Sequence, residues 1–371
     1  MVKPTKLRRR PMLHLRVPPG RSGLDIFSSK TITSLDRAGI ATSLDLIWPQ
    51  SVYQLFNSGR LPLGRRFFRA IVAPFYANKI LHEIKAGDVL WIPSFCVPEA
   101  RVPNVERKLK MAAVSYIFHL MDDWFNVDFL REGTIERCKL AALVGVPTPQ
   151  LAERVREMVP SVKVGVFEEP IDLDRLRDNQ TKHFTGKPVV LWCGNPYNLR
   201  LIGGALDILR HIRKRIPYTL RIVCGEQPSK NFSDGLDIEW KQFNHEAEGQ
   251  LVEGSWLGIA PMPDTAYNRC KGAYKVKTYL AAGLPVVASP VGFQSELVRG
   301  GNGVGLLPES PAEWEQAIST LLGNPSLCAQ MGAKARSYAE QRFSYSATTP
   351  HWAGTLLQHF PSLARPMARF Q

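Results

Sequence analysis

The chain has 371 residues, which corresponds to about two domains of ordinary size. Hydrophobic residues make up 44% of it and charged residues 22%, a globular composition that excludes global disorder, collagen-like repeats and a small disulfide-rich fold. The formal net charge is +14, and residues 1–110 carry 19 Lys and Arg against 7 Asp and Glu, or +12, so the excess belongs to the first third of the chain.

A basic region of this kind indicates a nucleic acid, an anionic membrane surface or a phosphorylated ligand as the partner. No run approaches about 18 apolar residues, and the basic start at 1–10 has no apolar segment behind it, so neither a membrane span nor a signal peptide is predicted. The cysteines are scattered without a CxxC pair, which argues against a zinc site and a disulfide framework. We expect a cytoplasmic protein, with peripheral attachment at the inner face of the membrane left open.

The first half of the chain reads as strands that alternate with helices. A strand at 13–17 is followed by a glycine-containing loop at 18–23 and by a helix with apolar Ile26, Ile32 and Leu35. Short apolar runs then recur at intervals long enough for crossover helices, which is typical of a parallel sheet covered on both faces. These further strands are predicted at 43–47, 89–93, 112–118, 142–146 and 162–167.

The same pattern starts again at Lys187. A buried-type strand at 188–194 ends in glycine, and the helix after it places Ile202, Leu209 and Ile216 on one face. Ser310 and Asn324, each followed by proline, mark the starts of two later helices. Further strands are predicted at 220–223, 238–242, 257–261 and 284–289.

The polar stretch 172–186 between the two patterns is predicted as a linker. We therefore expect a domain at 1–180, a second at 181–347, and a last helix within 348–371 that packs back on the first domain. Both domains are predicted to be Rossmann-like, and such folds bind ligands at the carboxyl ends of their strands. We expect these ends to face each other across a cleft.

The most informative stretch is residues 261–292, which read PMPDTAYNRCKGAYKVKTYLAAGLPVVASPVG. It leads from a strand end, through a loop with Asp264, Arg269 and Lys271, into a helix that carries Lys275. A helix N-terminus with lysines beside it is suited to phosphate, because its N–H groups, its dipole and the cations all attract anions.

This stretch resembles the donor-binding core of GT-B-fold glycosyltransferases of the retaining family 4 type, in which a lysine-bearing helix leads into A-x-G-x-P-V-V-A-S-x-x-G. The similarity extends less sharply over most of the chain, to the loop at 18–23, to residues 121–124 and to 193–195. It implies a GT-B fold and transfer of a sugar from a nucleotide-sugar donor, held by the second domain, to an acceptor held by the first. It also implies a retaining reaction that needs no metal.

The chain departs from that family at two positions. Such enzymes commonly carry two glutamates spaced E-x7-E, and here the aligned residues are Cys270 and Thr278. A carboxylate that binds donor hydroxyls is therefore absent from these positions, and Thr278 offers only a hydroxyl. Either the donor is held differently or activity is impaired.

The remaining donor-site candidates follow strands of the second domain, and each has a structural alternative. Lys271 and Lys275 are predicted to contact pyrophosphate, although lysines on helices are usually solvated. Asn195 fits either a donor contact or an ordinary turn, and Asp264 either a site role or a local turn. The other candidates are Gly194, Arg200, Gly225, Glu226 and Thr278.

Two groups of candidates lie in the first domain. His119, Asp122 and Asp123 follow a strand, where a carboxylate or polar group could stabilise an oxocarbenium-like state or take the acceptor proton. The alternative for Asp123 is capping of the next helix. The loop residues Gly20, Ser22 and Gly23 would let a donor phosphate or an acceptor approach the backbone, or form a plain turn.

A basic amphipathic helix is predicted around residues 65–75. Helical spacing places Phe67 and Phe68 on one side with the cations on its flank, a pattern that suits an anionic membrane surface. A helix that faces the core with a solvated edge explains the pattern equally well. The membrane-surface candidates are Arg65, Arg66, Phe67, Phe68 and Arg69.

The sequence therefore predicts a metal-independent glycosyltransferase whose acceptor is a glycan or a lipid-linked sugar of polysaccharide or cell-envelope biosynthesis. The alternative is a GT-B-fold subunit that binds without catalysis, because Cys270 and Thr278 replace the two glutamates. Nucleic acid is not expected as a partner, since no recognisable nucleic-acid-binding module is present.

Overall fold

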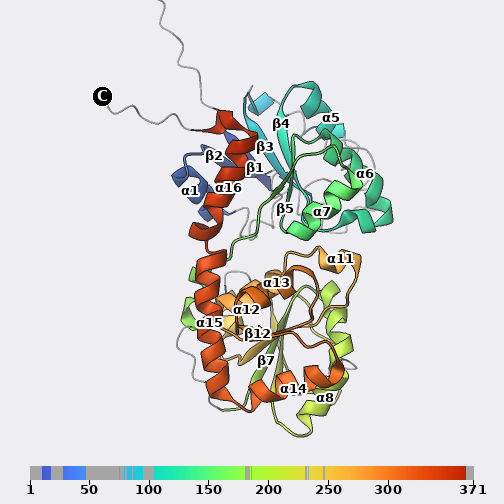
Figure 1. Ribbon diagram of the computed structural model, residues 1–371, viewed down its shortest axis with the longest axis vertical. Helices are drawn as coiled ribbons and strands as arrows, with labels where there is room; N and C mark the ends of the chain where they lie inside the picture. The colour runs from blue at the N-terminus through green and yellow to red at the C-terminus, as the bar shows by residue number, and fades with distance from the viewer. Residues whose placement is uncertain are drawn as a thin grey trace, which may run out of the picture. The chain divides into compact units, whose positions relative to one another are not determined.

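The computed structural model describes residues 11–17, 28–46, 75, 79, 82–85, 87–94, 104–179, 184, 186–229, 232, 234–244 and 247–364. The chain divides into two compact units. Unit 1 comprises Met1–Glu168 and Thr348–Gln371, and unit 2 comprises Glu169–Ala347. In the described residues each unit has a six-stranded parallel sheet with helices around it (Figure 1). The predicted α/β class with two doubly wound units is confirmed.

The sheet of unit 1 has the strand order β2-β1-β3-β4-β5-β6, and its paired strands run parallel. Its strands are β1 Leu13–Val17, β2 Thr42–Leu46, β3 Val89–Pro93, β4 Ser115–His119, β5 Leu143–Val146 and β6 Val164–Val166. Its helices are α1 Ser29–Arg37, α5 Asn104–Met111, α6 Asp128–Leu140, α7 Pro149–Met158 and α16 Tyr345–His359, with the 3-10 helices η4 Trp124–Asn126 and η7 Pro361–Leu363.

The end of the chain completes the core of unit 1. Trp352 and Leu356 of α16 are buried together with Leu15 of β1 and Trp91 of β3. Helix α16, drawn in red in Figure 1, therefore lies against the sheet formed by the start of the chain. An isolated antiparallel bridge between Ile40 and Ala364 adds a backbone contact between the same two segments.

The sheet of unit 2 has the strand order β12-β11-β10-β7-β8-β9 and is also parallel. Its strands are β7 Val189–Cys193, β8 Thr219–Cys224, β9 Ile238–Gln242, β10 Leu257–Ala260, β11 Val286–Ala288 and β12 Gly305–Leu306. Its helices are α8 Leu206–Arg213, α10 Glu248–Val252, α11 Ala266–Arg269, α12 Tyr274–Ala281, α13 Gly292–Gly300, α14 Pro311–Leu322 and α15 Pro325–Phe343, with the 3-10 helices η5 Leu173–Asn179 and η6 Pro196–Ala205.

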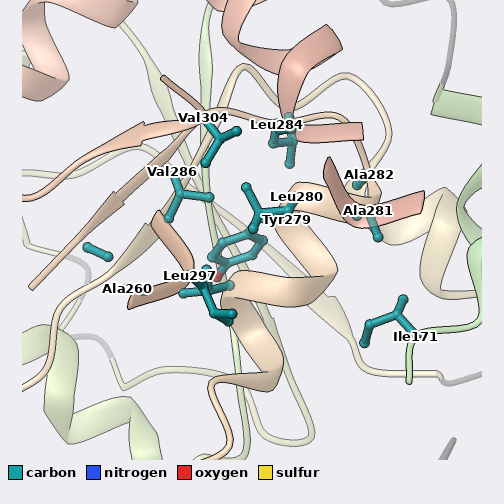
Figure 2. Close-up of a cluster of buried hydrophobic side chains, with 14 of the residues drawn as sticks. Ile171, Ala260, Tyr279, Leu280, Ala281, Ala282, Leu284, Val286, Leu297 and Val304 are labelled. Atoms are coloured by element: carbon teal, nitrogen blue, oxygen red, sulfur yellow. The ribbon is translucent and has the colours of Figure 1, made fainter. Parts of the chain in front are cut away.

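Alternate residues of the unit 2 strands point into two separate cores. Trp192 of β7 and Ile259 of β10 face the layer that holds α8 and α14. Leu191 and Ala260, their neighbours along the strands, face the layer of α12, α13 and α15. Figure 2 shows the second core, with the Tyr279 ring of α12 among the aliphatic side chains. This alternation is the reason why the strands read as continuous apolar runs in the sequence.

The boundary between the units lies at Glu168 and Glu169 rather than at the expected 180/181. Residues 173–179, expected in a linker, form η5, and Leu176 is buried in a unit 2 core. Among the described residues, no helix is long and apolar enough to span a bilayer.

Candidate functional site

The strand order of unit 2 locates the place where a ligand site is expected. In a sheet that grows in both directions, ligands bind where neighbouring strands connect to opposite sides, and here that point lies between β7 and β10. The buried Tyr279 hydroxyl joins the two strand ends, because it accepts from the Cys193 N–H at 2.9 Å and donates to the Ile259 carbonyl at 3.3 Å. The residues after Cys193 are therefore held at a defined edge.

Helix α12 begins at this edge without a side-chain cap. Its N-cap residue, Ala273, has a left-handed backbone with φ of 55°, which is uncommon for a residue other than glycine. The Lys271 N–H bonds to the Asn268 carbonyl at 3.2 Å, and this turn separates α11 from α12. Because the first N–H groups of a helix lack carbonyl partners one turn back, such a start attracts anions.

Lys275 lies in the first turn of α12 and reaches the end of β7. Its Nζ is 4.6 Å from the centre of the Trp192 ring and 3.1 Å from the position that a Cβ would take on Gly194. Burial, helped by the positive charge of Lys271, lowers the pKa of Lys275 to about 8. A bound anion would therefore stabilise an ammonium group that the protein itself solvates poorly.

Gly194 is required by this arrangement. A Cβ there would lie 2.8 Å from the Trp192 ring, so a side chain would displace either the tryptophan or Lys275. The next residue, Asn195, caps η6 through its side chain, which accepts from the Asn198 N–H at 2.8 Å. The structure thus supports the turn-forming alternative for the Asn195 side chain.

Other donor-site candidates are exposed and lie in η6, which follows β7, and in the loop after β8. The Arg200 guanidinium stacks over the exposed Tyr197 ring at 4.0 Å from its centre. Gly225 and Glu226 follow β8 and are exposed, and a Cβ on Gly225 would contact Pro196 at 3.7 Å. The loops after β7 and β8 therefore lie next to each other.

Asp264 makes a local ion pair with Arg269, the last residue of α11. Arg269 donates to both carboxylate oxygens, at 2.5 and 2.8 Å, and this contact lowers the pKa of Asp264. Gly292, at the start of α13, fits against the Arg269 backbone, where a Cβ would lie 2.3 Å from the carbonyl oxygen. The Asp264 side chain thus helps to hold the loop that leads into α12.

Thr278 and Cys270, which occupy the two glutamate positions of the resembling family, are both buried. The Thr278 hydroxyl donates to Oε1 of Glu248 at 3.3 Å, and Oε2 of Glu248 is 3.2 Å from an Arg175 nitrogen. A buried carboxylate therefore does contact α12, but it comes from α10. Sequence reasoning did not find Glu248, because nothing in the spacing of residues 244–252 marks it.

In unit 1, His119 belongs to the core. It is fully buried, its Nδ1 accepts from the Trp91 indole N–H at 3.1 Å, and the two rings stack at 5.6 Å. Burial lowers the pKa of His119 to about 3, so the ring is neutral at physiological pH. A hydrogen-bonded core histidine explains these contacts without a catalytic role.

Asp123 lies under the surface and caps η4. It accepts from the Phe125 N–H at 3.1 Å and from the Asn126 amide, while the Arg154 Nε is 3.7 Å away. Burial raises the pKa of Asp123 against the lowering effect of these partners. Asp122, next to it, is half-buried. The contacts of His119 and Asp123 therefore serve the core and the cap, and Asp122 remains the candidate with exposed surface.

Two groups of predicted residues lie outside the part of the chain that the structure describes. They are the loop residues Gly20, Ser22 and Gly23 and the membrane-surface residues Arg65, Arg66, Phe67, Phe68 and Arg69.

In a comparison with known protein families, the part of the chain that matches lies in unit 2. Residues 187–324 match the model of the family described as glycosyl transferases group 1. This match covers every donor-site candidate from Gly194 to Thr278. No curated protein is significantly similar to the chain in sequence.

Solved glycosyltransferase structures share the fold over almost the whole chain. A sucrose-phosphate synthase from Thermosynechococcus elongatus is 17% identical with a TM-score of 0.69, over 95% of this chain and 100% of that one. Anabaena HepE in complex with UDP and glucose is 17% identical with a TM-score of 0.66, over 94% and 100%. A UDP-forming α,α-trehalose-phosphate synthase from Burkholderia xenovorans is 10% identical with a TM-score of 0.62, over 96% and 99%. The fold is therefore the GT-B fold of these glycosyltransferases.

Proposed function

We propose that the protein is a glycosyltransferase that moves a sugar from a nucleotide-sugar donor to an acceptor hydroxyl. The observation that carries this proposal is the placement of Lys275 beside Gly194 at the β7–β10 edge, in the first turn of an uncapped helix. The family match over 187–324 supports the same assignment for unit 2.

In the proposed reaction, the bond between the anomeric carbon and the donor phosphate oxygen breaks while the acceptor oxygen bonds to that carbon, and the acceptor proton passes to the departing phosphate or to solvent. Negative charge then develops on the departing nucleoside diphosphate. Lys275, Lys271 and the start of α12 would stabilise this charge, and interactions that strengthen as charge develops accelerate the reaction. Since two cations can serve this purpose, we propose that no metal is needed.

The finer parts of the proposal rest on the resemblance in residues 261–292 and on the charge distribution. We propose a retaining reaction and an acceptor that is a glycan or a lipid-linked sugar, as in polysaccharide or cell-envelope biosynthesis. The +12 excess in residues 1–110 supports peripheral contact with an anionic membrane, or an acceptor with a lipid phosphate. Retention on anionic liposomes that is lost when Arg65, Arg66 and Arg69 are changed to Glu would support this part.

A second function is a GT-B-fold subunit that binds nucleotide sugars without turnover. The buried Thr278 favours it, since a short hydroxyl engaged by Glu248 stands where the family has a glutamate. Calorimetric titration with UDP-, GDP- and dTDP-sugars, followed by an assay of donor hydrolysis and transfer, separates the two functions. Binding with turnover supports the enzyme, binding without turnover supports the subunit, and absence of binding contradicts both.

Ligands of related proteins suggest where to start the donor screen. HepE was solved with UDP and glucose, and the Burkholderia enzyme is a UDP-forming synthase. UDP-sugars are therefore the first donors to test, with the GDP- and dTDP-sugars as comparison.

A further inference from the structure

Charged side chains of unit 2 hold one segment beside helix α12. The segment consists of η5 and the residues just before it. Lys277, fully buried in α12, donates to the Glu169 carbonyl at 3.0 Å. Arg336 of α15 donates to the Ala281 carbonyl at 2.7 Å and to the Leu176 carbonyl at 3.4 Å. The segment from Glu169 to Leu176 is therefore fastened beside α12 near both ends.

The contact nearest the start of α12 is made by Arg175 and Glu248. The Arg175 guanidinium lies 3.2 Å from Oε2 of Glu248 and donates to the Tyr274 hydroxyl at 3.3 Å. Glu248 is 3% exposed and binds the Thr278 hydroxyl through its other oxygen. The pair thus contacts α12 at Tyr274 and at Thr278, four residues apart on one face of the helix.

The backbone around this pair leaves little room for it to shift. A Cβ on Gly249, the residue after Glu248, would lie 2.3 Å from the Arg175 carbonyl oxygen. Helix α10 and η5 are therefore in direct backbone contact beside the ion pair. A buried ion pair contributes little net stability, because desolvation of the two charges offsets their attraction. Its role here therefore concerns the position of the residues that it contacts.

We propose that Arg175 and Glu248 are positioning residues for nucleotide binding: they fix the first turn of α12, and with it Lys275, in the orientation that receives the donor phosphates. Tyr274 immediately precedes Lys275, so a rotation of that turn would move the ammonium away from Gly194. This inference rests on the proposed function, because it takes the start of α12 as the phosphate site.

The test uses the full chain and UDP, GDP and dTDP as probes. Glu248→Gln keeps the shape and the contact with Thr278 but removes the negative charge of Glu248 beside Arg175. We expect this variant and Arg175→Met each to raise the Kd of the nucleotide about tenfold. The double variant should raise it no further, because both changes remove the same contact.

The matched control is Glu106→Gln in unit 1, which breaks the Arg137–Glu106 pair, an even more deeply buried ion pair with a distance of 2.8 Å. A merely structural role predicts that both glutamine variants lower the unfolding midpoint and leave the Kd of the folded protein unchanged. Positioning predicts that only Glu248→Gln changes the Kd. Arg175→Lys, which retains the charge, should recover part of the affinity.

If Glu248→Gln does not fold, Tyr274→Phe replaces it, since it removes the contact of Arg175 with the first turn of α12 and leaves the ion pair intact. A folded variant of either kind with wild-type affinity overturns the positioning role while the proposed function stands. Wild-type protein that binds none of the three nucleotides overturns the proposed function, and the positioning role falls with it.

Discussion

Lys275 is held where its own positive charge is disfavoured, which makes it the side chain that gains most from a bound phosphate. Lys275→Met keeps the length and loses the charge, and we expect a loss of about a hundredfold or more in kcat/KM with the fold retained. Lys334→Met on the exposed face of α15 is the matched control. Wild-type activity in Lys275→Met would remove Lys275 from the site.

The pKa of Lys275, lowered to about 8 by burial, predicts two opposite effects of pH. The affinity for UDP should fall as pH rises through about 8, because the free protein loses the ammonium that binds phosphate. The stability of the free protein should instead rise between about 8 and the ordinary lysine pKa of about 10.4, because only the unfolded chain still binds the proton there.

Calorimetry and thermal unfolding between pH 6.5 and pH 10 measure the two effects. Lys275→Met should show neither of them, because it removes the titrating group. An affinity that is equal in wild type at pH 7 and pH 9.5 would mean that the lysine charge does not contact the ligand.

Individual residues differ in how far the sequence alone could place them. The motif predicts Lys275 as a site residue, and the structure places it beside Gly194, a separate candidate from the sequence. Lys277, two residues on, looks like a solvated lysine in the sequence but is fully buried on the Glu169 carbonyl. The role of Glu248 cannot be predicted from the sequence either, because its partners Arg175 and Thr278 are far away along the chain. Local patterns carry no information about such tertiary partners.

At the scale of elements, the packing of α12 on β10 depends on Gly258, a residue without a side chain. A Cβ on Gly258 would lie 2.4 Å from the Tyr279 ring, whose hydroxyl joins the ends of β7 and β10. We expect Gly258→Ala to destabilise the protein by about 1–3 kcal/mol, as for other overpacked cores, and to weaken UDP binding. Urea unfolding measures the first effect and calorimetry the second.

Gly204→Ala is the control for that substitution, since a Cβ on Gly204 would meet no atom within 4 Å. Equal stability of the two alanine variants would show that Tyr279 can move aside without cost. The hydrogen bonds of its hydroxyl to the ends of β7 and β10 would then not be needed for stability.

The apolar runs in the sequence predict that the strands exist. They do not predict where each strand begins, because the end of the preceding helix decides that. The strand predicted at 112–118 begins only at Ser115, because Ala113 is left-handed and the Val114 N–H bonds back to Leu109 at the end of α5. Likewise β11 begins at Val286, since the Leu284 N–H bonds back to Tyr279. β12, of two residues, is too short to leave a pattern, and the helix expected after β7 starts as η6.

At the scale of the whole molecule, unit 1 is made from two separate stretches of chain and unit 2 from one. Ending the chain at Ala347 would remove Trp352, Leu356 and Phe360 from the unit 1 core. Each buried side chain of this kind contributes about 1.5–3 kcal/mol, and domains are stable by only about 5–15 kcal/mol. We expect the truncated chain to lose unit 1 and to keep a folded unit 2.

Hydrogen exchange resolved by peptide would show this as lost protection over residues 115–146 with retained protection over 189–343. Nucleotide binding should survive the truncation, since Lys271, Lys275 and the start of α12 all belong to unit 2. Full protection of β4 and β5 in the shortened chain would contradict the role given to α16.

The hydrogen bond between the Ile171 N–H and the Phe343 carbonyl, 2.9 Å long, brings the two ends of unit 2 together. During synthesis, unit 2 can therefore fold by itself and bring its two ends together. The folded unit 2 then holds residues up to 168 close to those from 348 onward, which together form unit 1. Without that step the two parts of unit 1 would have to find each other across a long unfolded loop, whose closure entropy grows with length. We therefore expect unit 2 to fold first during synthesis and unit 1 to complete its core only after α16 has been made.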